Sequence, residues 1–295
     1  MNRIRSQPAA RGIVESVGDV EMNTNMGNES EKKMERRKPM KDRVALVTGG
    51  SGGIGRAISY RLSIAGASVI ILGRNQVKGK SVVKSIVSYN DGQAKFYRTD
   101  LAKDKEIVQT VHDVFEEFGR IDILVNNAAI SGYMGPVVET PIKELRKVMQ
   151  VNLFSIFYLS RLVLPKMIEN NFGRIINISS VAYRKNTPNS ATYNISKAGL
   201  NTLTRTLSKE VAMYGITVNA VAPGLVLTDR IIKCRLPIMA SKVGVTSEEM
   251  LRRLTAGTDT GHLTTEDDVA QLVMFLASDH SQNITGEIID ISGGL

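Results

Sequence analysis

Tryptophan is absent from the 295-residue sequence, cysteine occurs once, as Cys234, and histidine occurs three times. A lone cysteine cannot close an intrachain disulfide, and there is no CxxC or Cys/His cluster, so no metal site is expected. This cysteine usage is typical of a reducing compartment and predicts a cytoplasmic protein. Uninterrupted apolar runs stay well below the roughly 18 residues of a membrane span, so no membrane partner is predicted.

Acidic residues are the minority charge, with 29 Asp and Glu against 38 Lys and Arg and a formal net charge of +9. That balance suits nucleic acid, a membrane surface or a phosphorylated ligand. The dense basic run EKKMERRKPMKDR, however, contains interleaved acids and follows a polar segment without apolar periodicity. We therefore predict a solvated, disordered extension over residues 1–40, which cannot offset its ordering entropy, and no nucleic-acid partner. Glu15, Asp19 and Glu21 argue against a transit peptide. Met40 stands immediately before the ordered pattern, so an alternative is that translation starts there and the extension is a start-site artefact.

Seven short apolar runs alternate with helical periodicity from Arg43 to the C-terminus. They are RVALVTGG, SVIILGR, AKFYRTDL, IDILVNNAA, GRIINISS, ITVNAVAPG and GEIIDISGG. This rhythm predicts an α/β fold, a doubly wound, Rossmann-type, seven-stranded parallel sheet with helices on both faces. No composition break divides the pattern, so residues 41–295 are predicted to form a single domain. Its ligand crevice should lie at the carboxyl ends of the strands.

A glycine-rich turn, TGGSGGIG, follows the first predicted strand and opens a helix. Two registers fit, one with Gly50, Gly52 and Gly55 and the other with Gly49, Gly53 and Gly55. In both, a turn without side chains lets backbone amides approach a pyrophosphate at the positive end of the helix. A purely structural turn is the alternative, but the strand–turn–helix context favours dinucleotide binding. The predicted cofactor contacts here are Gly49, Ser51, Gly52, Gly53, Ile54 and Gly55.

The end of the second predicted strand, ILGRN, bears on the choice of cofactor. NAD-selective sites place an acidic residue there, about 20 residues beyond the glycine turn, to bind the ribose 2′-hydroxyl. Gly73 stands at or next to that place and Arg74 follows it. Because an arginine pairs with a 2′-phosphate through charge-assisted hydrogen bonds, the sequence predicts NADP(H). The alternative is that Arg74 is only a solvated loop charge.

The third and fourth predicted strands end in Asp100-Leu101 and in NNAA, which contains Asn127. The Asp100 carboxylate can accept from the adenine amino group, although aspartate is also an ordinary turn or N-cap residue. The small residues of NNAA leave room for a ligand, and its asparagines can hold neighbouring loops together. We include Asp100, Leu101 and Asn127 among the predicted cofactor contacts.

A phenol and an amine lie one helical turn apart in YNISK, as Tyr193 and Lys197, thirteen residues beyond Ser180. Residues four apart share a helix face, so a charged Lys197 is expected to lower the pKa of Tyr193 toward working pH. Tyr193 would then exchange a proton with a substrate oxygen held by Ser180. Asn152, amid the apolar MQVNLFSIF, either supports a water leading to Lys197 or bonds a core carbonyl.

From about Arg43 to Leu295 the sequence resembles the short-chain dehydrogenase/reductase family. TGGSGGIG, DL, NNAA, Asn152, ISS, YNISK, APGLVLTD and ITGEIIDISGG occur in the family's order. The resemblance implies that Asn152, Ser180, Tyr193 and Lys197 form a catalytic tetrad. It also implies that Tyr193, Lys197, Val226 and Thr228 contact the nicotinamide half of the cofactor. NNAA replaces the commoner NNAG, and Gly52 stands where many NADP-selective members carry a basic residue, so Arg74 alone supports the 2′-phosphate argument.

Surplus apolar residues on two predicted helices indicate an interface between copies of the chain. The residues are Phe154, Phe157, Leu200 and Leu203. Together with the family resemblance, they predict a homotetramer built on paired helices.

Within the family, NAVAPGLVLTD and the C-terminus look most like 3-oxoacyl-[acyl-carrier-protein] reductases. Some of these dock the carrier protein with basic residues where Asn171 and Tyr214, both uncharged, stand here. The long segment over about 229–262 instead predicts a partly apolar lid over a free small molecule, or else surface packing alone. Its apolar candidates are Ile231, Ile232, Leu236, Ile238 and Met239. We predict a reductase of a small-molecule carbonyl; the carrier-protein reductase and a non-catalytic nucleotide-binding scaffold remain alternatives.

Overall fold

The computed structural model describes residues 38–90 and 92–294, and the predicted extension before residue 38 lies outside the described residues. The folded unit starts at Lys38. Met40, the last residue assigned to the extension, is 1% exposed, and its amide donates a hydrogen bond to the Ala65 carbonyl at 2.8 Å. The chain is therefore packed into the core from just before the first strand.

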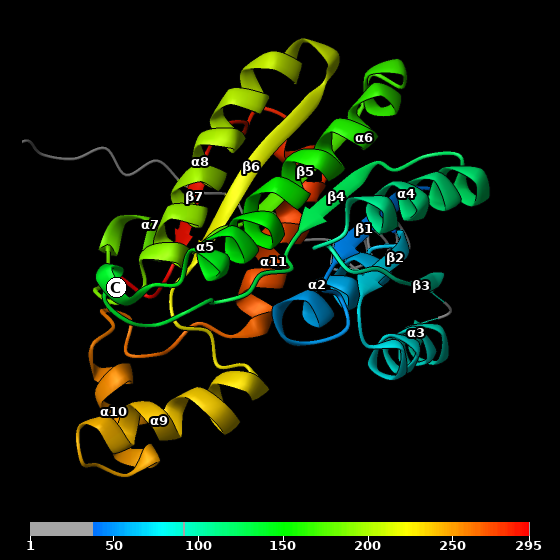
Figure 1. The fold of residues 1–295 in the computed structure, drawn as a ribbon. Coiled ribbons are helices and arrows are strands. Elements are labelled where there is room, and N and C mark those ends of the chain that lie inside the picture. Colours follow the sequence, from blue (N-terminus) through cyan, green and yellow to red (C-terminus); the bar gives the residue numbers. More distant parts are fainter. Residues whose placement is uncertain (1–37, 91, 295) are drawn as a thin grey trace, which may run out of the picture. The chain divides into compact units, whose positions relative to one another are not determined.

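Seven parallel strands form one sheet in the order β3-β2-β1-β4-β5-β6-β7, which confirms the predicted doubly wound fold (Figure 1). They are β1 (Val44–Thr48), β2 (Ser68–Gly73), β3 (Ala94–Arg98), β4 (Ile123–Asn126), β5 (Gly173–Ile178), β6 (Ile216–Pro223) and β7 (Ile288–Ile291). The chain order reverses between β1 and β4. Ligand crevices of such sheets open at this point, beyond the carboxyl ends of the strands.

Helices cover both faces of the sheet (Figure 1). The longer ones are α2 (Gly53–Ile64), α3 (Gln76–Asn90), α4 (Asp104–Phe118), α5 (Ile142–Met149), α6 (Ser155–Glu169), α8 (Ala191–Val211), α10 (Ser247–Ala256) and α11 (Glu266–Ala277). Shorter turns are η1 (Val137–Glu139), η2 (Gln150–Phe154), α7 (Ala182–Lys185), η3 (Ala212–Tyr214), η4 (Ile231–Arg235), α9 (Leu236–Lys242) and η5 (Asp279–Ser281). One core lies between the sheet and α2, α3 and α11, and the other between the sheet and α4, α6 and α8.

Alternate residues of the central strands supply the two cores. In β1, Ala45 and Val47 face the first core, while Val44 and Leu46 face the second. Because both sets are apolar and buried, the strands read as continuous apolar runs without polar alternation. The sequence pattern identified them for this reason.

The segment 142–169 is one continuous helical rod in which α5, the wide turn η2 and α6 follow each other. By length and composition alone it could cross a membrane, but 44% of its most apolar window is buried inside the fold. Leu159, Val163 and Met167 pack into the second core. The rod is therefore a core helix, and its apolar character reflects packing against the sheet.

Residues 229–262, the predicted lid, contain η4, α9 and α10 and have a small core of their own, formed by Leu236, Ala240 and Met250. Figure 1 shows α9 and α10 as a flap beside the helices that cover the sheet. Of the predicted apolar lid residues, Leu236 and Met239 pack within this core, whereas Ile232 and Ile238 are exposed.

Candidate active site

The glycine turn between β1 and α2 satisfies the register of Gly49, Gly53 and Gly55. Gly49 and Gly53 have φ of +65° and +56°, values at which a side chain is strained. A Cβ on Gly55 would lie 2.3 Å from the Gly49 carbonyl oxygen. Gly52 is extended, with open space around a Cβ, so the register through Gly50 and Gly52 places no such demand at this position.

Asn127 fastens this turn to the end of β4. Its side-chain amide donates to the Thr48 carbonyl at 2.9 Å and to the Gly49 carbonyl at 3.4 Å. The Thr48 hydroxyl accepts from the amides of Asn127 and Ala128 at 2.9 and 3.0 Å. These bonds fix the glycine turn relative to the neighbouring strand, as the holding role considered for the NNAA asparagines requires.

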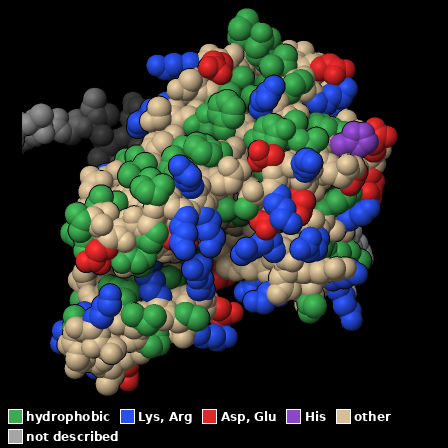
Figure 2. All heavy atoms as spheres, in the orientation of Figure 1, with side chains coloured by type: hydrophobic (Ala, Val, Ile, Leu, Met, Phe, Trp, Pro, Cys, Tyr) green, Lys and Arg blue, Asp and Glu red, His purple; other side chains and the backbone are tan. Residues whose placement is uncertain are grey.

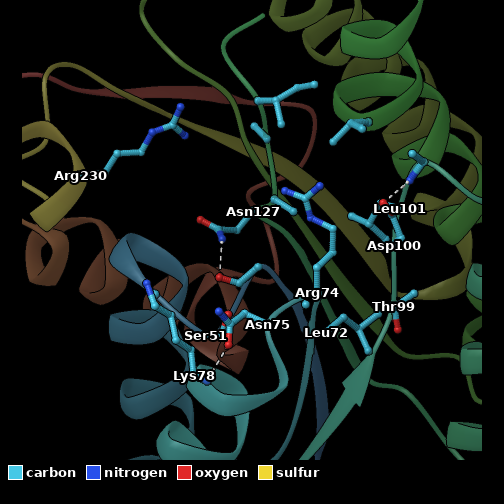
Figure 3. A pocket seen from close by; sticks show the side chains of 18 of the residues that line it. Ser51, Leu72, Arg74, Asn75, Lys78, Thr99, Asp100, Leu101, Asn127 and Arg230 are labelled. Atoms are coloured by element: carbon cyan, nitrogen blue, oxygen red, sulfur yellow. Dashed lines mark hydrogen bonds between the residues drawn. The ribbon is translucent and has the colours of Figure 1, made fainter. Parts of the chain in front are cut away.

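A cleft of about 630 Å³ lies at the carboxyl ends of β1 to β4 (Figure 3). The predicted cofactor residues that line it are Gly49, Ser51, Gly52, Arg74, Asp100, Leu101 and Asn127. Gly53, Ile54 and Gly55 begin α2 behind this lining. Tyr193, Lys197, Val226 and Thr228 lie outside it. Position, size and the adjoining helix start suit the adenosine and pyrophosphate portion of a dinucleotide.

Two cations and one hydroxyl lie around the end of β2, where an NAD-selective site has a carboxylate. Arg74 and Lys78 both line the cleft, and Asn75 begins α3 by accepting from the Lys78 amide at 2.9 Å. The Ser51 hydroxyl lies 3.2 Å from where a Gly73 Cβ would be. Among the described residues, neither Arg74 nor Lys78 has a carboxylate within ion-pair distance. Lys78 was not among the predicted cofactor residues, although it stands only four residues after Arg74 in the sequence.

Asp100 occupies the cleft and also shapes its own turn. Its carboxylate accepts from the Ala102 amide at 3.1 Å, and its backbone amide donates to Glu106 at 2.9 Å. The other carboxylate oxygen has no such bond to the described residues, so it can accept from a ligand. Both roles considered for Asp100 from the sequence are therefore compatible with the geometry.

The end of β5 and the first turns of α8 bring Ser180, Tyr193 and Lys197 together. Lys197 is 2% exposed, and its Nζ donates to the Ile178 carbonyl at 2.6 Å. The same Nζ lies 5.6 Å from the centroid of the Tyr193 ring. The Ser180 side chain lies near enough to the Tyr193 hydroxyl to lower its pKa, and the Ser180 hydroxyl accepts from the Ala182 amide at 3.2 Å. A phenol, a hydroxyl and an ammonium thus converge beyond the carboxyl end of β5.

The pKa values of this group differ from the sequence-based expectation. Burial raises the pKa of Tyr193, and this outweighs the lowering by the Ser180 side chain and by the charges of Arg235 and Arg230. Burial also lowers the pKa of Lys197 to about 8. The expectation that Lys197 depresses the pKa of Tyr193 is therefore wrong for the free protein. Desolvation dominates, and the Lys197 ammonium donates to a strand carbonyl instead.

Asn152 lies at the centre of the wide turn η2 and is fully buried. Its carbonyl accepts from the Ile130 amide at 2.9 Å, and its amide donates to the Ile130 carbonyl at 2.9 Å and to the Ser196 hydroxyl at 3.1 Å. This bonding matches the backbone role considered for it. Asn152 ties the loop after β4 to α8, one residue before Lys197, and so helps to position the lysine.

Val226 and Thr228 lie where the chain leaves β6 for the lid. Val226 is 5% exposed and forms an isolated bridge with Thr264, at the far end of the lid. The Thr228 methyl lies 3.6 Å from where a Gly53 Cβ would be. Thr228 therefore lies beside the start of α2, whereas the Val226 side chain is buried in the first core.

Comparisons with known proteins agree with this arrangement. The model of the family described as short chain dehydrogenase matches residues 43–236. Among curated proteins, the chain is 37% identical over 257 residues to the 3-oxoacyl-[acyl-carrier-protein] reductase of Haemophilus influenzae. The match covers 87% of this chain and 99% of the reductase.

Two solved structures are similar over most of the chain and differ in cofactor. An NAD⁺-bound xylitol dehydrogenase is 30% identical with a TM-score of 0.81, covering 86% of this chain and 99% of its own. A putative NAD(P)-dependent gluconate 5-dehydrogenase from Beutenbergia cavernae, with NADP bound at low occupancy, is 32% identical with a TM-score of 0.78. That match covers 88% of this chain and 98% of the other. Neighbours of this fold thus hold either dinucleotide.

Proposed function

The chain belongs to the short-chain dehydrogenase family, and on that basis we propose an NADP(H)-dependent oxidoreductase that interconverts a ketone and a secondary alcohol. The observation that carries the proposal is the convergence of Ser180, Tyr193 and the buried Lys197 beyond the end of β5. The dinucleotide cleft at the neighbouring strands supports it. A non-catalytic scaffold would have no use for a buried lysine aligned with a phenol.

In the proposed reaction the nicotinamide, when bound, supplies the hydride for the carbonyl carbon. Ser180 donates a hydrogen bond to the carbonyl oxygen and orients it toward Tyr193. Tyr193 is protonated at neutral pH because burial raises its pKa, so it is a proton donor in the direction of reduction. Lys197, Val226 and Thr228 would hold the nicotinamide side, and the glycine turn would bind the pyrophosphate.

The reaction is tested by measuring NADPH oxidation with a panel of small ketones, quinones and 3-oxoacyl thioesters. We expect turnover of free ketones, because a lid over residues 229–262 would enclose a small-molecule site. The alternative, a 3-oxoacyl-[acyl-carrier-protein] reductase, is favoured by the curated relative in Haemophilus influenzae. Turnover restricted to carrier-bound thioesters would favour that alternative, and no turnover of any member would contradict the reductase proposal.

NADP(H) preference is the next expectation, and it rests on Arg74 and Lys78. Arg74→Ala should weaken NADPH binding by up to about 2 kcal/mol, the scale of one charge-assisted contact, and leave NADH binding nearly unchanged. Lys78→Ala should act in the same direction. Dissociation constants from fluorescence titration check both variants, with Lys80→Ala on the exposed side of α3 as the control. A wild-type preference for NADH would show that the interpretation of ILGRN is wrong.

A homotetramer is also expected in solution. Phe154 and Phe157 are 52% and 56% exposed on the rod of residues 142–169, and Ile195 is 52% exposed on α8. Leu200, which the sequence analysis assigned to this surface, is instead fully buried within the single chain. Light scattering should give the mass of four 32.3 kDa chains, and Phe154→Asp with Phe157→Asp should reduce it. A monomer at micromolar concentration would refute the assembly.

A further inference from the structure

A second hollow lies at the edge of the sheet opposite the dinucleotide cleft. Figure 2 shows Lys and Arg side chains around the hollow beside the flap of α9 and α10. The second hollow has a volume of about 360 Å³, and its lining comes from the start of β1, the turns before β5 and β6, and the segment after α11. No described residue lines both this hollow and the dinucleotide cleft. The two are separate because the strands are parallel and their amino ends lie across the sheet from their carboxyl ends.

Two arginines enter this second hollow, and both lie over the ring of Phe172. The ring centroid is 3.5 Å from the Arg43 guanidinium carbon and 4.4 Å from that of Arg174. The Arg174 side chain is 5% exposed, and its guanidinium donates to the carbonyls of Gly173 and Gly215 at 2.9 and 3.1 Å. The strand ends therefore fix one buried guanidinium, and the aromatic ring holds a second beside it.

The nearby carboxylates leave both guanidiniums short of partners. Asp122 accepts from Arg120 at 2.6, 2.9 and 3.0 Å and lies 3.9 Å from Arg43. Asp279, whose side chain is 67% exposed, lies 3.8 Å from Arg43 and 3.7 Å from Arg174. These distances exceed that of a hydrogen bond. One exposed carboxylate is thus shared by two arginines and is hydrogen bonded to neither.

The electrostatics of Arg174 reflect this arrangement. Burial lowers the pKa of Arg174, the charge of Asp279 opposes the lowering, and the charge of Arg43 adds to it. Arginine nevertheless stays protonated at neutral pH. Two adjacent cations repel each other more strongly in a partly buried site than in water. A bound oxyanion would relieve that repulsion, because guanidiniums bind carboxylate and phosphate through paired, charge-assisted hydrogen bonds.

The rest of the lining is rich in amides and hydroxyls. The side chains of Asn171, Thr217, Gln282 and Asn283 line the hollow and have no hydrogen-bond partner among the described residues. A volume of about 360 Å³ lies within the range of roughly 300–1,000 Å³ that is typical of small-molecule sites. The lining therefore suits a ligand that carries hydroxyl groups as well as a negative charge.

We infer that this hollow, the amino-edge site around Arg43, Phe172 and Arg174, binds a small hydroxylated metabolite through a carboxylate or a phosphate group. The two guanidiniums take the anionic group, and the amide and hydroxyl side chains bond the ligand hydroxyls. The site goes beyond the proposed function, because it lies away from the catalytic and cofactor residues. Since the ligand joins β1, β5 and β6 to the segment after α11, its binding should stabilise the fold.

The test is a calorimetric titration of the full chain at low ionic strength, where charges are least screened. The probes are inorganic phosphate, ribose 5-phosphate and tartrate, with uncharged ribose for comparison. We expect ribose 5-phosphate or tartrate to bind and to raise the melting temperature, and ribose not to bind. The anion that binds more tightly tells phosphate from carboxylate. If none of the three anions binds the wild type, the amino-edge site is overturned.

Variants assign the bound anion to one of the two hollows. Arg43→Gln should lower the affinity for the anion at least about 10-fold, the scale of one hydrogen bond to a charged group, and leave NADPH affinity unchanged. Arg74→Ala, in the dinucleotide cleft, should leave the anion affinity unchanged, as should Arg252→Gln on the exposed side of the lid. An affinity that falls in Arg74→Ala and not in Arg43→Gln would place the anion in the cleft and overturn the inference.

Asp279→Asn supplies a change in the opposite direction. It removes the carboxylate that competes for both guanidiniums, so affinity for the anion should rise about 2- to 5-fold, the scale of one exposed charge. If the arginines only hold the strand ends together, this variant would lower the melting temperature without any gain in anion affinity. An unchanged or lower affinity would therefore overturn the inference, and this readout does not depend on the stability of Arg43→Gln.

Discussion

Tyr193→Phe should lower turnover at least about 100-fold while the fold and the cofactor site stay intact. The ring still packs beside Lys197, and only the hydroxyl that would give its proton to the substrate is lost. One general acid–base group contributes on this scale. Turnover, NADPH affinity and melting temperature measured on the same preparation check the prediction. Because the removed hydroxyl lies beside Ser180, a small change in stability is expected, but no loss of cofactor binding.

Tyr158→Phe provides the matched control, because Tyr158 packs against the second core on α6, away from the site. It should keep full turnover. A Tyr193→Phe enzyme that is fully active but melts at a lower temperature would mean that YNISK serves packing, and the catalytic interpretation would be abandoned.

A variant of Ser180 tests the same catalytic interpretation by a second measurement. Ser180→Ala removes the neighbour of the Tyr193 hydroxyl and one of the groups that lower its pKa. It should cut turnover without altering cofactor affinity, because Ser180 does not line the dinucleotide cleft. A matching fall in NADPH affinity would place Ser180 in cofactor binding instead.

The features that were predicted correctly depend on short sequence patterns. Continuous apolar runs revealed the parallel strands because both sheet faces are covered, and the spacing of Tyr193 from Lys197 placed both on one helix face. The glycine register was left open, and it depended on φ at Gly49 and Gly53 and on the contact of Gly55 with Gly49. These constraints come from the tertiary fold, so the sequence alone could not distinguish the two registers.

The remaining differences come from burial, which a linear pattern does not reveal. Leu200 was expected on an outer face but packs inside, because helix α8 lies against both the sheet and the neighbouring rod. The pKa of Tyr193 was expected to fall, yet desolvation raises it. Arg230 followed a recognised motif, APGLVLTD, but only the folded lid places it at the cleft.

Lys197→Met should abolish most turnover and yet stabilise the protein at neutral pH. Burial lowers the pKa of Lys197 from 10.5 to about 8, so the unfolded chain binds more protons than the folded one between these values. Folding stability therefore rises as pH increases from about 8 to 10.5, and at pH 7 the full cost of burying the ammonium is present. Methionine removes this cost, a gain of up to about 3 kcal/mol, which the lost bond to the Ile178 carbonyl reduces.

Loss of the Lys197 ammonium should lower activity, although it should raise folding stability. If the ammonium holds the nicotinamide side and supports Tyr193, kcat/KM for NADPH, which reports the free enzyme, should fall as pH rises through about 8. Lys197→Met should lack this alkaline limb and bind NADPH more weakly. Its stability advantage over the wild type, from chemical unfolding, should shrink between pH 8 and 10.5. Lys209→Met, on the exposed last turn of α8, should show neither change. A Lys197→Met protein that is less stable at pH 7 and retains turnover would identify Lys197 as a structural residue. On the catalytic interpretation, activity requires the ammonium in the core although its burial costs folding free energy.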